Sequence, residues 1–303
     1  MADIFLRPIP GFALEIWEKL IGDWFFVFAL GFLAFELIRY AFRGKLSKTM
    51  AGDTVTNYIT LAFFIGVNTL LFAAFYVGVY FYAAEFAVFD IQTNIATLLI
   101  CLMLADLAYY WEHRILHRIN FLWATHSVHH SSPFFNISVA YRHGPLDGLW
   151  PLFFHLPLVL LGFDPFLVLV VELLVQLFQT ILHTETIGKF WKPIELIFNT
   201  PSHHRVHHGS NRKYLDKNYA GIFIIWDRMF GTFAEEIEEV KYGLTRPIDS
   251  VNPFVAFFHG FQRLGKEVAQ ADGLYNKMGH LFGPPGWRPK KKPTATPPTD
   301  AGE

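Results

Sequence analysis

Long apolar runs are the feature that most constrains how this chain can fold. The clearest are WFFVFALGFLAFELI at residues 24–38 and YITLAFFIGVNTLLFAAFYVGVYFYAA at residues 58–84. Because an α-helix rises 1.5 Å per residue, about 20 such residues cross the roughly 30 Å hydrocarbon core of a bilayer. The whole chain of 303 residues is 52% hydrophobic, with 33 Phe. A water-soluble enzyme of this length needs more polar surface, so the sequence predicts an all-α integral membrane protein.

We expect about four to five transmembrane helices with a histidine-rich helical cap on the cytoplasmic side. The first three spans are expected at about residues 24–40, 56–82 and 92–111. The apolar segment 146–183 is interrupted by the turn GFDP, and Pro151 and Pro157 kink its first half. This segment therefore forms either two spans or a re-entrant hairpin.

The charged loops predict how the chain is oriented. The first span is followed by Arg39, Arg43, Lys45 and Lys48, whereas residues 83–91 contain no Lys or Arg. Since cytoplasmic loops are enriched in Lys and Arg, the histidine-rich segments are expected on the cytoplasmic face, in a bacterial inner membrane or the endoplasmic reticulum. The expected organisation is a membrane region with two spans (1–91), a histidine-rich domain (92–240), a cytoplasmic helical segment (241–283) and a disordered tail (284–303).

Composition excludes several classes of function. The net charge of −1 gives no indication of nucleic acid as a partner. The single cysteine, Cys101, excludes an intrachain disulfide and a cysteine-based zinc or iron–sulfur site. The sequence says nothing about the oligomeric state.

Nine of the 14 histidines lie in two short windows, 113–130 and 203–208. The first window contains HRILH and HSVHH, and the second contains HRVHH. Residues three and four apart share one face of a helix, so two imidazoles at that spacing can bind one metal ion. These units provide eight candidate ligands, which are His113, His117, His126, His129, His130, His204, His207 and His208. Eight ligands are too many for one ion, so we expect two metals, or one metal that leaves several histidines unused.

Other polar residues are candidates for supporting roles. His183, with Gln179 one turn before it, ends the last apolar segment and is expected to be a ninth ligand. His143 is a candidate for ligation or for the pocket wall. His203 is a weaker candidate for ligation, because a residue next to His204 faces away from it on a helix, and it is expected to support a ligand instead. Asp106 lies two turns before His113 and is either an acceptor for a ligand imidazole N–H or a solvated helix-end carboxylate. Weaker candidates of the same supporting kind are Asn136 and Asp227.

The three motifs resemble the histidine boxes of the fatty acid hydroxylase/sterol desaturase superfamily, whose members are membrane-bound non-haem di-iron enzymes. The resemblance covers about residues 92–235. Within the superfamily, HSVHHSSPFFNISVAYR and the segment beginning NTPSHHRVHHGS are most similar to the alkylglycerol monooxygenase family. One departure is Arg118, which stands where the animal members carry an acidic residue.

The resemblance implies that the eight box histidines bind two iron ions, and that Gln179 stands where some relatives carry another histidine. It also implies dioxygen as co-substrate and an external reductant, either a separate electron-donor protein or a diffusible molecule such as tetrahydrobiopterin. The expected reaction is hydroxylation of a C–H bond in a membrane lipid, whether a fatty acyl, sterol-like or ether lipid. The alternatives are desaturation on the same scaffold and a non-catalytic metal-binding or metal-transporting membrane protein.

Overall fold

The computed structural model describes residues 11–71 and 73–289, and this part of the chain is helical and contains no β-strands. The predicted all-α class is therefore confirmed. The α-helices in chain order are α2 (Gly11–Phe42), α3 (Lys48–Leu71), α4 (Ala73–Ala84), α5 (Ile95–Leu116), α6 (Asn120–His126), α7 (Trp150–Leu161), α8 (Pro165–Leu182), α9 (Lys192–Ile197), α10 (Pro201–His207), α11 (Ile225–Met229), α12 (Pro253–Gln270) and α13 (Gly273–Phe282). Short 3₁₀ turns are η1 (His129–Ser131), η2 (Ile137–Tyr141) and η3 (Asp147–Leu149).

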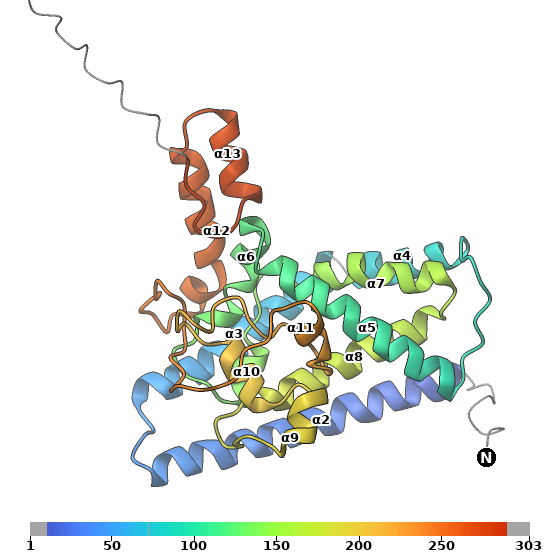
Figure 1. The fold of residues 1–303 in the computed structure, drawn as a ribbon, viewed down its shortest axis with the longest axis horizontal. Coiled ribbons are helices and arrows are strands. Elements are labelled where there is room, and N and C mark those ends of the chain that lie inside the picture. Colours follow the sequence, from blue (N-terminus) through green and yellow to red (C-terminus); the bar gives the residue numbers. More distant parts are fainter. Residues whose placement is uncertain (1–10, 72, 290–303) are drawn as a thin grey trace, which may run out of the picture.

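Four helices among the described residues are long and apolar enough to cross a membrane. They are Asp23–Phe42 of α2, together with α3, α5 and α8. Helix α8 packs against both α2 and α5 in one bundle (Figure 1). Large apolar side chains on the outside of the bundle are exposed, among them Trp24, Leu70 and Phe81. Such a surface is suited to lipid and not to water, so the chain is an integral membrane protein.

Two apolar segments differ from the simplest expectation. The run at 56–82 is divided between α3 and α4, and the first half of the segment 146–183 forms the short helix α7. Helices α4 and α7 have 12 residues each. At 1.5 Å per residue they are about 18 Å long, too short to cross the hydrocarbon core. Of the two arrangements expected for residues 146–183, the hairpin therefore fits better.

The turn between α7 and α8 is fixed by backbone geometry. Gly162 ends α7 with a φ of 113°, and a Cβ at this position would overlap the backbone of Phe89. Asp164 then caps α8 by accepting hydrogen bonds from the N–H groups of Phe166 and Leu167. Below the turn, buried residues of α4, α5, α7 and α8 form one apolar cluster. This packing fixes α8, whose last turn leads directly into His183.

The loop between α2 and α3 lies at the same end of the bundle as His183. The Tyr40 hydroxyl donates to Glu185 Oε2 at 2.9 Å, and Arg39 Nη1 donates to Thr186 Oγ1 at 3.2 Å. The basic loop that begins near these residues and the histidine-rich segments therefore share one side of the bundle, as the charge pattern predicts.

Helices α12 and α13 form a hairpin that projects from the body of the molecule (Figure 1). Helix α12 lies close against α6, and a Cβ at Gly260 would overlap the backbone of Ala124. After α13 the chain folds back, with the Trp287 ring 5.1 Å from that of His280. The remainder of the expected disordered tail, residues 290–303, lies outside the described residues.

A buried arginine holds the loop after η1 against α3. Arg142 is fully buried, and its Nη1 donates to Asp53 Oδ1 and Asn57 Oδ1, each at 2.8 Å. Its Nε donates to Val128 O and Ser131 Oγ. The arginine thus joins a membrane helix to the segment that carries the second histidine motif.

We expect Asp53→Ala to destabilise the protein strongly, because it leaves the buried Arg142 charge without its carboxylate. Breaking one side of a buried ion pair costs about 3–5 kcal/mol. Lys213→Ala is the matched control, since it removes an ion pair whose partners, Lys213 and Glu238, are both exposed and costs about 1 kcal/mol or less. Thermal unfolding in detergent measures both. Equal melting temperatures for the two variants would contradict the structural role of Arg142.

Candidate metal centre

Nine buried histidines converge into two adjacent groups that could each hold a metal ion. Within each group the candidate ligand nitrogens lie within 4.8 Å of one another. We call them the five-histidine group and the four-histidine group. The first comprises His113, His117, His126, His130 and His207, and the second comprises His129, His183, His204 and His208.

Each motif contributes to the groups from a defined element. Helix α5 ends with the HRILH motif, so His113 lies in its last turn and His117 is its C-cap. The HSVHH motif continues from the end of α6 into η1, and the HRVHH motif occupies α10 and its C-cap. His183 caps the C-terminus of α8. The histidines of HSVHH and of HRVHH divide between the two groups, so the groups share these supporting elements, whereas both histidines of HRILH belong to the five-histidine group.

Backbone carbonyls orient several of the imidazoles. Nδ1 of His113 lies 2.9 Å from Tyr219 O, and Nδ1 of His207 lies 2.9 Å from Lys217 O. In the four-histidine group, Nδ1 of His129 lies 3.2 Å from Arg142 O and Nδ1 of His183 lies 2.9 Å from Gln179 O. A carbonyl oxygen can only accept, so each of these Nδ1 atoms carries the hydrogen. Each Nε2 of the neutral ring is left with a free lone pair.

These lone pairs point at one another. Nε2 of His129 and Nε2 of His183 are 3.2 Å apart, although both rings already carry their hydrogen on Nδ1. Neither nitrogen can donate to the other, so their contact is repulsive unless a cation lies between them. Nε2 of His204 lies 2.9 Å from Nε2 of His183. A third imidazole nitrogen therefore lies next to this pair.

The five-histidine group also contains imidazole nitrogens that lie close together or have no hydrogen-bond partner. Nε2 of His113 lies 3.1 Å from Nε2 of His126, and the buried Nε2 atoms of His117 and His207 have no hydrogen-bond partner. Imidazole nitrogens lie about 2.0–2.1 Å from a bound zinc ion, so two of them at a right angle are about 3 Å apart. The observed separations fit shared coordination. The residues present thus fit metal ions better than any network of hydrogen bonds among themselves.

Burial keeps the rings ready to bind metal. It lowers the pKa of His126, His129, His130 and His208 well below the ordinary value, and the neighbouring histidines lower each further. These imidazoles are therefore neutral near pH 7, and a neutral imidazole is the form that binds a metal ion.

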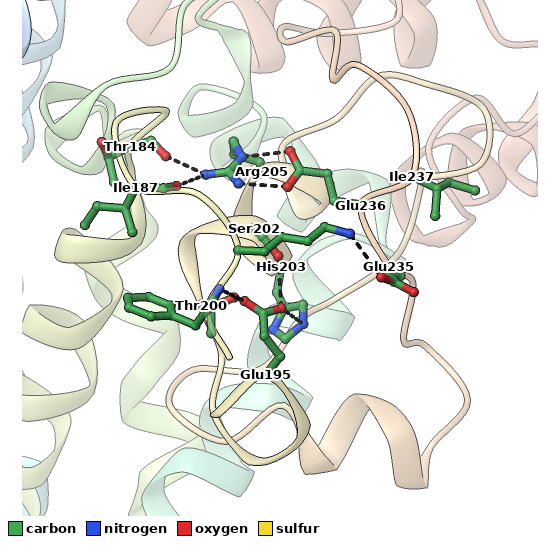
Figure 2. Close-up of polar contacts among 12 residues, drawn as sticks. Thr184, Ile187, Glu195, Thr200, Ser202, His203, Arg205, Glu235, Glu236 and Ile237 are labelled. Atoms are coloured by element: carbon green, nitrogen blue, oxygen red, sulfur yellow. Dashed lines mark hydrogen bonds and ion pairs between the residues drawn. The ribbon is translucent and has the colours of Figure 1, made fainter. Parts of the chain in front are cut away.

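Arg205, inside the HRVHH motif, anchors α10 to the segment after His183 (Figure 2). Its Nε and Nη2 donate to both carboxylate oxygens of Glu236, at 2.8 and 2.7 Å. Its Nη1 donates to Thr184 O at 3.0 Å and to Ile187 O at 2.7 Å. One guanidinium group therefore holds two ligand-bearing segments at a fixed spacing.

His203 belongs to neither group and faces away from them, as its place next to His204 predicts. Its Nε2 lies 3.0 Å from Glu195 Oε2, and the same carboxylate accepts from Thr200 Oγ1 and Ser202 Oγ (Figure 2). Glu195 thereby fixes the first turn of α10, which has no side-chain cap of its own.

Asp106 and Asn136 have different surroundings from those expected. Asp106 is buried and accepts from Phe223 N–H and the Trp226 indole N–H, both near 2.9 Å, and from Ile222 N–H, so it contacts no imidazole. It is also not a solvated helix end. Asn136 caps η2 through Ser138 and contacts no histidine of either group. Both residues shape the loops around the groups.

Two other candidates act on the carbonyls that orient the ligands. Asp227 accepts from the Tyr219 and Ala220 N–H groups, and Tyr219 O is the partner of His113. Gln179 provides the carbonyl oxygen for His183 Nδ1. His143 lies outside both groups, and its ring stacks on Phe64 with centroids 4.6 Å apart.

Two cavities reach the histidines from different sides. The first, of about 460 Å³, runs between the membrane helices and is lined by His113, His126, His129 and His183 among mainly apolar residues. The second, of about 310 Å³, reaches His117, His130, His207 and His208 and is lined by Arg118, Arg246 and Arg263. The centre can therefore be approached through an apolar route and through a charged one.

Sequence reasoning did not identify several of these features. The carbonyls of Arg142, Tyr219 and Lys217 carry no signal in the residue type. Glu112, His155 and Glu172 in the membrane cavity were also missed. Charged residues inside otherwise apolar helices were the available signal, because such residues are rare and usually functional.

Comparison with known proteins agrees with this geometry. Residues 98–232 match the family model for fatty acid hydroxylase. Alkylglycerol monooxygenase of Homo sapiens is 46% identical over 187 residues, which cover 61% of this chain and 41% of the relative. The same enzyme of Danio rerio is 46% identical over 186 residues, with the same shares of each chain. Ornithine lipid hydroxylase OlsE of Rhizobium tropici is 32% identical over 133 residues, which cover 44% of this chain and 40% of the relative.

No solved structure matches the chain. The chain spans about 41% of the length of the alkylglycerol monooxygenases just named. The matched segment nevertheless contains all nine histidines of the two groups. Residues 98–232 belong to the fatty acid hydroxylase family.

Proposed function

We propose that this protein is a membrane-bound, non-haem di-iron oxygenase that hydroxylates a C–H bond of a lipid. The observation that carries the proposal is the convergence of Nε2 lone pairs in two neighbouring histidine groups, where the rings already use Nδ1 for backbone hydrogen bonds or leave Nε2 without a partner. The relatives named as lipid-hydroxylating enzymes support the reaction class. When bound, two iron ions would activate dioxygen for attack on an unreactive C–H bond, which metal-free side chains cannot achieve.

The residues of the chain would hold the metal ions and the lipid in position and keep water away from the reacting carbon. The five histidines and the four histidines would each hold one ion, and the carbonyl oxygens behind them keep the rings aimed. The membrane cavity would admit a lipid chain from between the helices and keep water from the reacting carbon. We further propose that this side of the bundle faces the cytoplasm, because the basic loop after α2 lies there.

Hydroxylation needs two electrons and two protons for each dioxygen, with one oxygen atom entering the lipid and the other leaving as water. Cys101 is the single cysteine of the sequence, so a cysteine-ligated iron–sulfur cluster is excluded as the source of these electrons within the chain. We propose that an external donor, either a separate protein or a diffusible reductant such as tetrahydrobiopterin, delivers electrons through the second cavity. Its arginines, and its lining by residues outside the four apolar helices apart from His117, which caps the end of α5, support this role.

The metal content tests the centre directly. We expect protein purified without oxygen to contain two iron ions per chain, and His129→Ala to contain about one. His129→Ala leaves three imidazoles in the four-histidine group. Loss of a residue that only orients a ligand already lowers metal affinity about 10- to 100-fold. Loss of a ligand itself is therefore expected to leave this group without its ion. His280→Ala is the control, because His280 lies in α13 outside both groups. If His129→Ala kept both ions and full lipid oxidation, the catalytic assignment would fail.

The product identifies the reaction. We expect membranes of cells that express the protein to contain a lipid with one added oxygen atom, and this atom should come from ¹⁸O₂ when the labelled gas is supplied. Lipid mass spectrometry with and without the gene measures it. A loss of two hydrogens without added oxygen would identify a desaturase instead. Bound metal without any change in lipids would indicate a metal-binding or metal-transporting protein.

A further inference from the structure

The segment that leads from His183 to α10 exposes a large apolar surface. Residues 188–198 contain α9, and every one of them except the half-buried Glu195 is exposed. The exposed large apolar side chains are Phe190, Trp191, Ile194, Leu196, Ile197 and Phe198. Trp191 alone is 75% exposed. A contiguous apolar surface of this kind marks a place where a protein meets another protein or a membrane.

The end of α11 extends this surface. Met229 is 67% exposed, and Phe230 next to it is also exposed. Arg228 Nη2 of α11 donates to Glu195 O of α9 at 3.2 Å, so the two helices lie side by side. We call the exposed apolar side chains of residues 190–198, together with Met229 and Phe230, the α9–α11 patch.

The α9–α11 patch joins the lipid-facing side of α5. The ring of Phe230 lies 5.0 Å from that of Trp111, which is exposed near the end of α5. Met103, eight residues before Trp111, is on the same face of this helix and is also exposed. Since α5 is one of the membrane-spanning helices, this face meets lipid. The patch is therefore continuous with a surface that the bilayer already covers.

The charged residues near the patch fit the headgroup layer of a bilayer. The Arg114 guanidinium lies 5.3 Å from the centre of the Trp111 ring, and Lys192 is exposed in the first turn of α9. Tryptophan is enriched where a membrane meets water, and long basic side chains there cover apolar surface and place their charge among the headgroups. Together with the continuity with α5, this composition favours lipid over a second protein as the cover of the patch.

The patch is attached directly to the helix that carries the third histidine motif. Glu195, the half-buried residue of α9, lies with its Oε2 3.0 Å from His203 Nε2 of α10 (Figure 2). Its carboxylate also accepts from Thr200 Oγ1 and Ser202 Oγ. Whatever covers α9 therefore lies close to α10, which positions ligands of both histidine groups.

We propose that the α9–α11 patch is immersed in the interfacial layer of the same bilayer that the long helices cross, and that lipid covers it. Trp191, Ile194 and Met229 enter the boundary between headgroups and acyl chains, and Lys192 reaches the headgroups. Because Glu195 ties α9 to α10, the ligand-bearing helix lies next to the lipid surface. The inference goes beyond the proposed function, since it concerns where the protein meets lipid and does not depend on the reaction.

Fluorescence quenching measures what covers the patch. Cys101 is the single cysteine and is buried, so wild-type protein treated with a thiol-reactive bimane is the blank. Ile194→Cys and Met229→Cys place the label on the patch, Met103→Cys places it on the lipid-facing side of α5, and Lys213→Cys places it in water. Each full-length variant is reconstituted in nanodiscs of phosphatidylcholine and phosphatidylglycerol. The two quenchers are lipid brominated close to its headgroup and aqueous iodide.

We expect brominated lipid to quench both patch labels at least about twofold more strongly than the Lys213 label, because an interfacial helix buries its apolar side chains about 5–10 Å into the lipid boundary. Iodide should quench both patch labels at least about twofold less than the Lys213 label, as it should the Met103 label. The two patch positions lie on different helices, so the test stands if one variant fails to fold. An unchanged melting temperature identifies the folded variants.

Strong quenching by iodide with weak quenching by brominated lipid, at either folded patch variant, would place the patch in water and overturn the inference. Protection from both quenchers would show that protein covers the patch, for example a second copy of this chain, and would also overturn it. None of these measurements involves dioxygen or a change in lipid chemistry. A failure of the proposed hydroxylation would therefore leave this result unchanged, and the two outcomes can be told apart.

Discussion

The structure depends on nine imidazoles that are buried together in their neutral form. Each ring has one nitrogen that can accept a proton or a metal, and packing brings these nitrogens to about the separation of ligands on a common ion. Without a cation the arrangement is electrostatically unfavourable, because lone pairs face lone pairs and buried nitrogens lack partners. Backbone carbonyls, the Arg205–Glu236 pair and the Arg142–Asp53 pair maintain it. Much of the surrounding polar network therefore serves to hold the rings in place.

Much of this could be predicted from the sequence, since it rests on spacing and composition. The i, i+3 and i, i+4 intervals place His126 with His130, and His204 with His208, within reach of each other. The apolar runs predict the bundle, and the end of the last run predicts where His183 lies. The division of the run at 56–82 into α3 and α4 was not predicted, because its residues are apolar throughout.

The supporting contacts could not be predicted, because they join residues far apart in the chain through backbone atoms. Asp106 was expected either to accept from a ligand imidazole two turns along α5 or to lie in water at a helix end. It instead holds the loop at Ile222, 116 residues away. The carbonyl of Arg142 that orients His129 depends on the path of a loop and not on the identity of a side chain. Only coordinates reveal such partners.

Helices α5 and α8 pass through the membrane and each ends at a different histidine group, α5 at His113 and His117 and α8 at His183. The tilt of membrane helices responds to the thickness of the bilayer around them. A change in tilt of α5 relative to α8 would alter the separation of the two groups. We therefore expect membranes of different thickness to change the spacing between the two histidine groups.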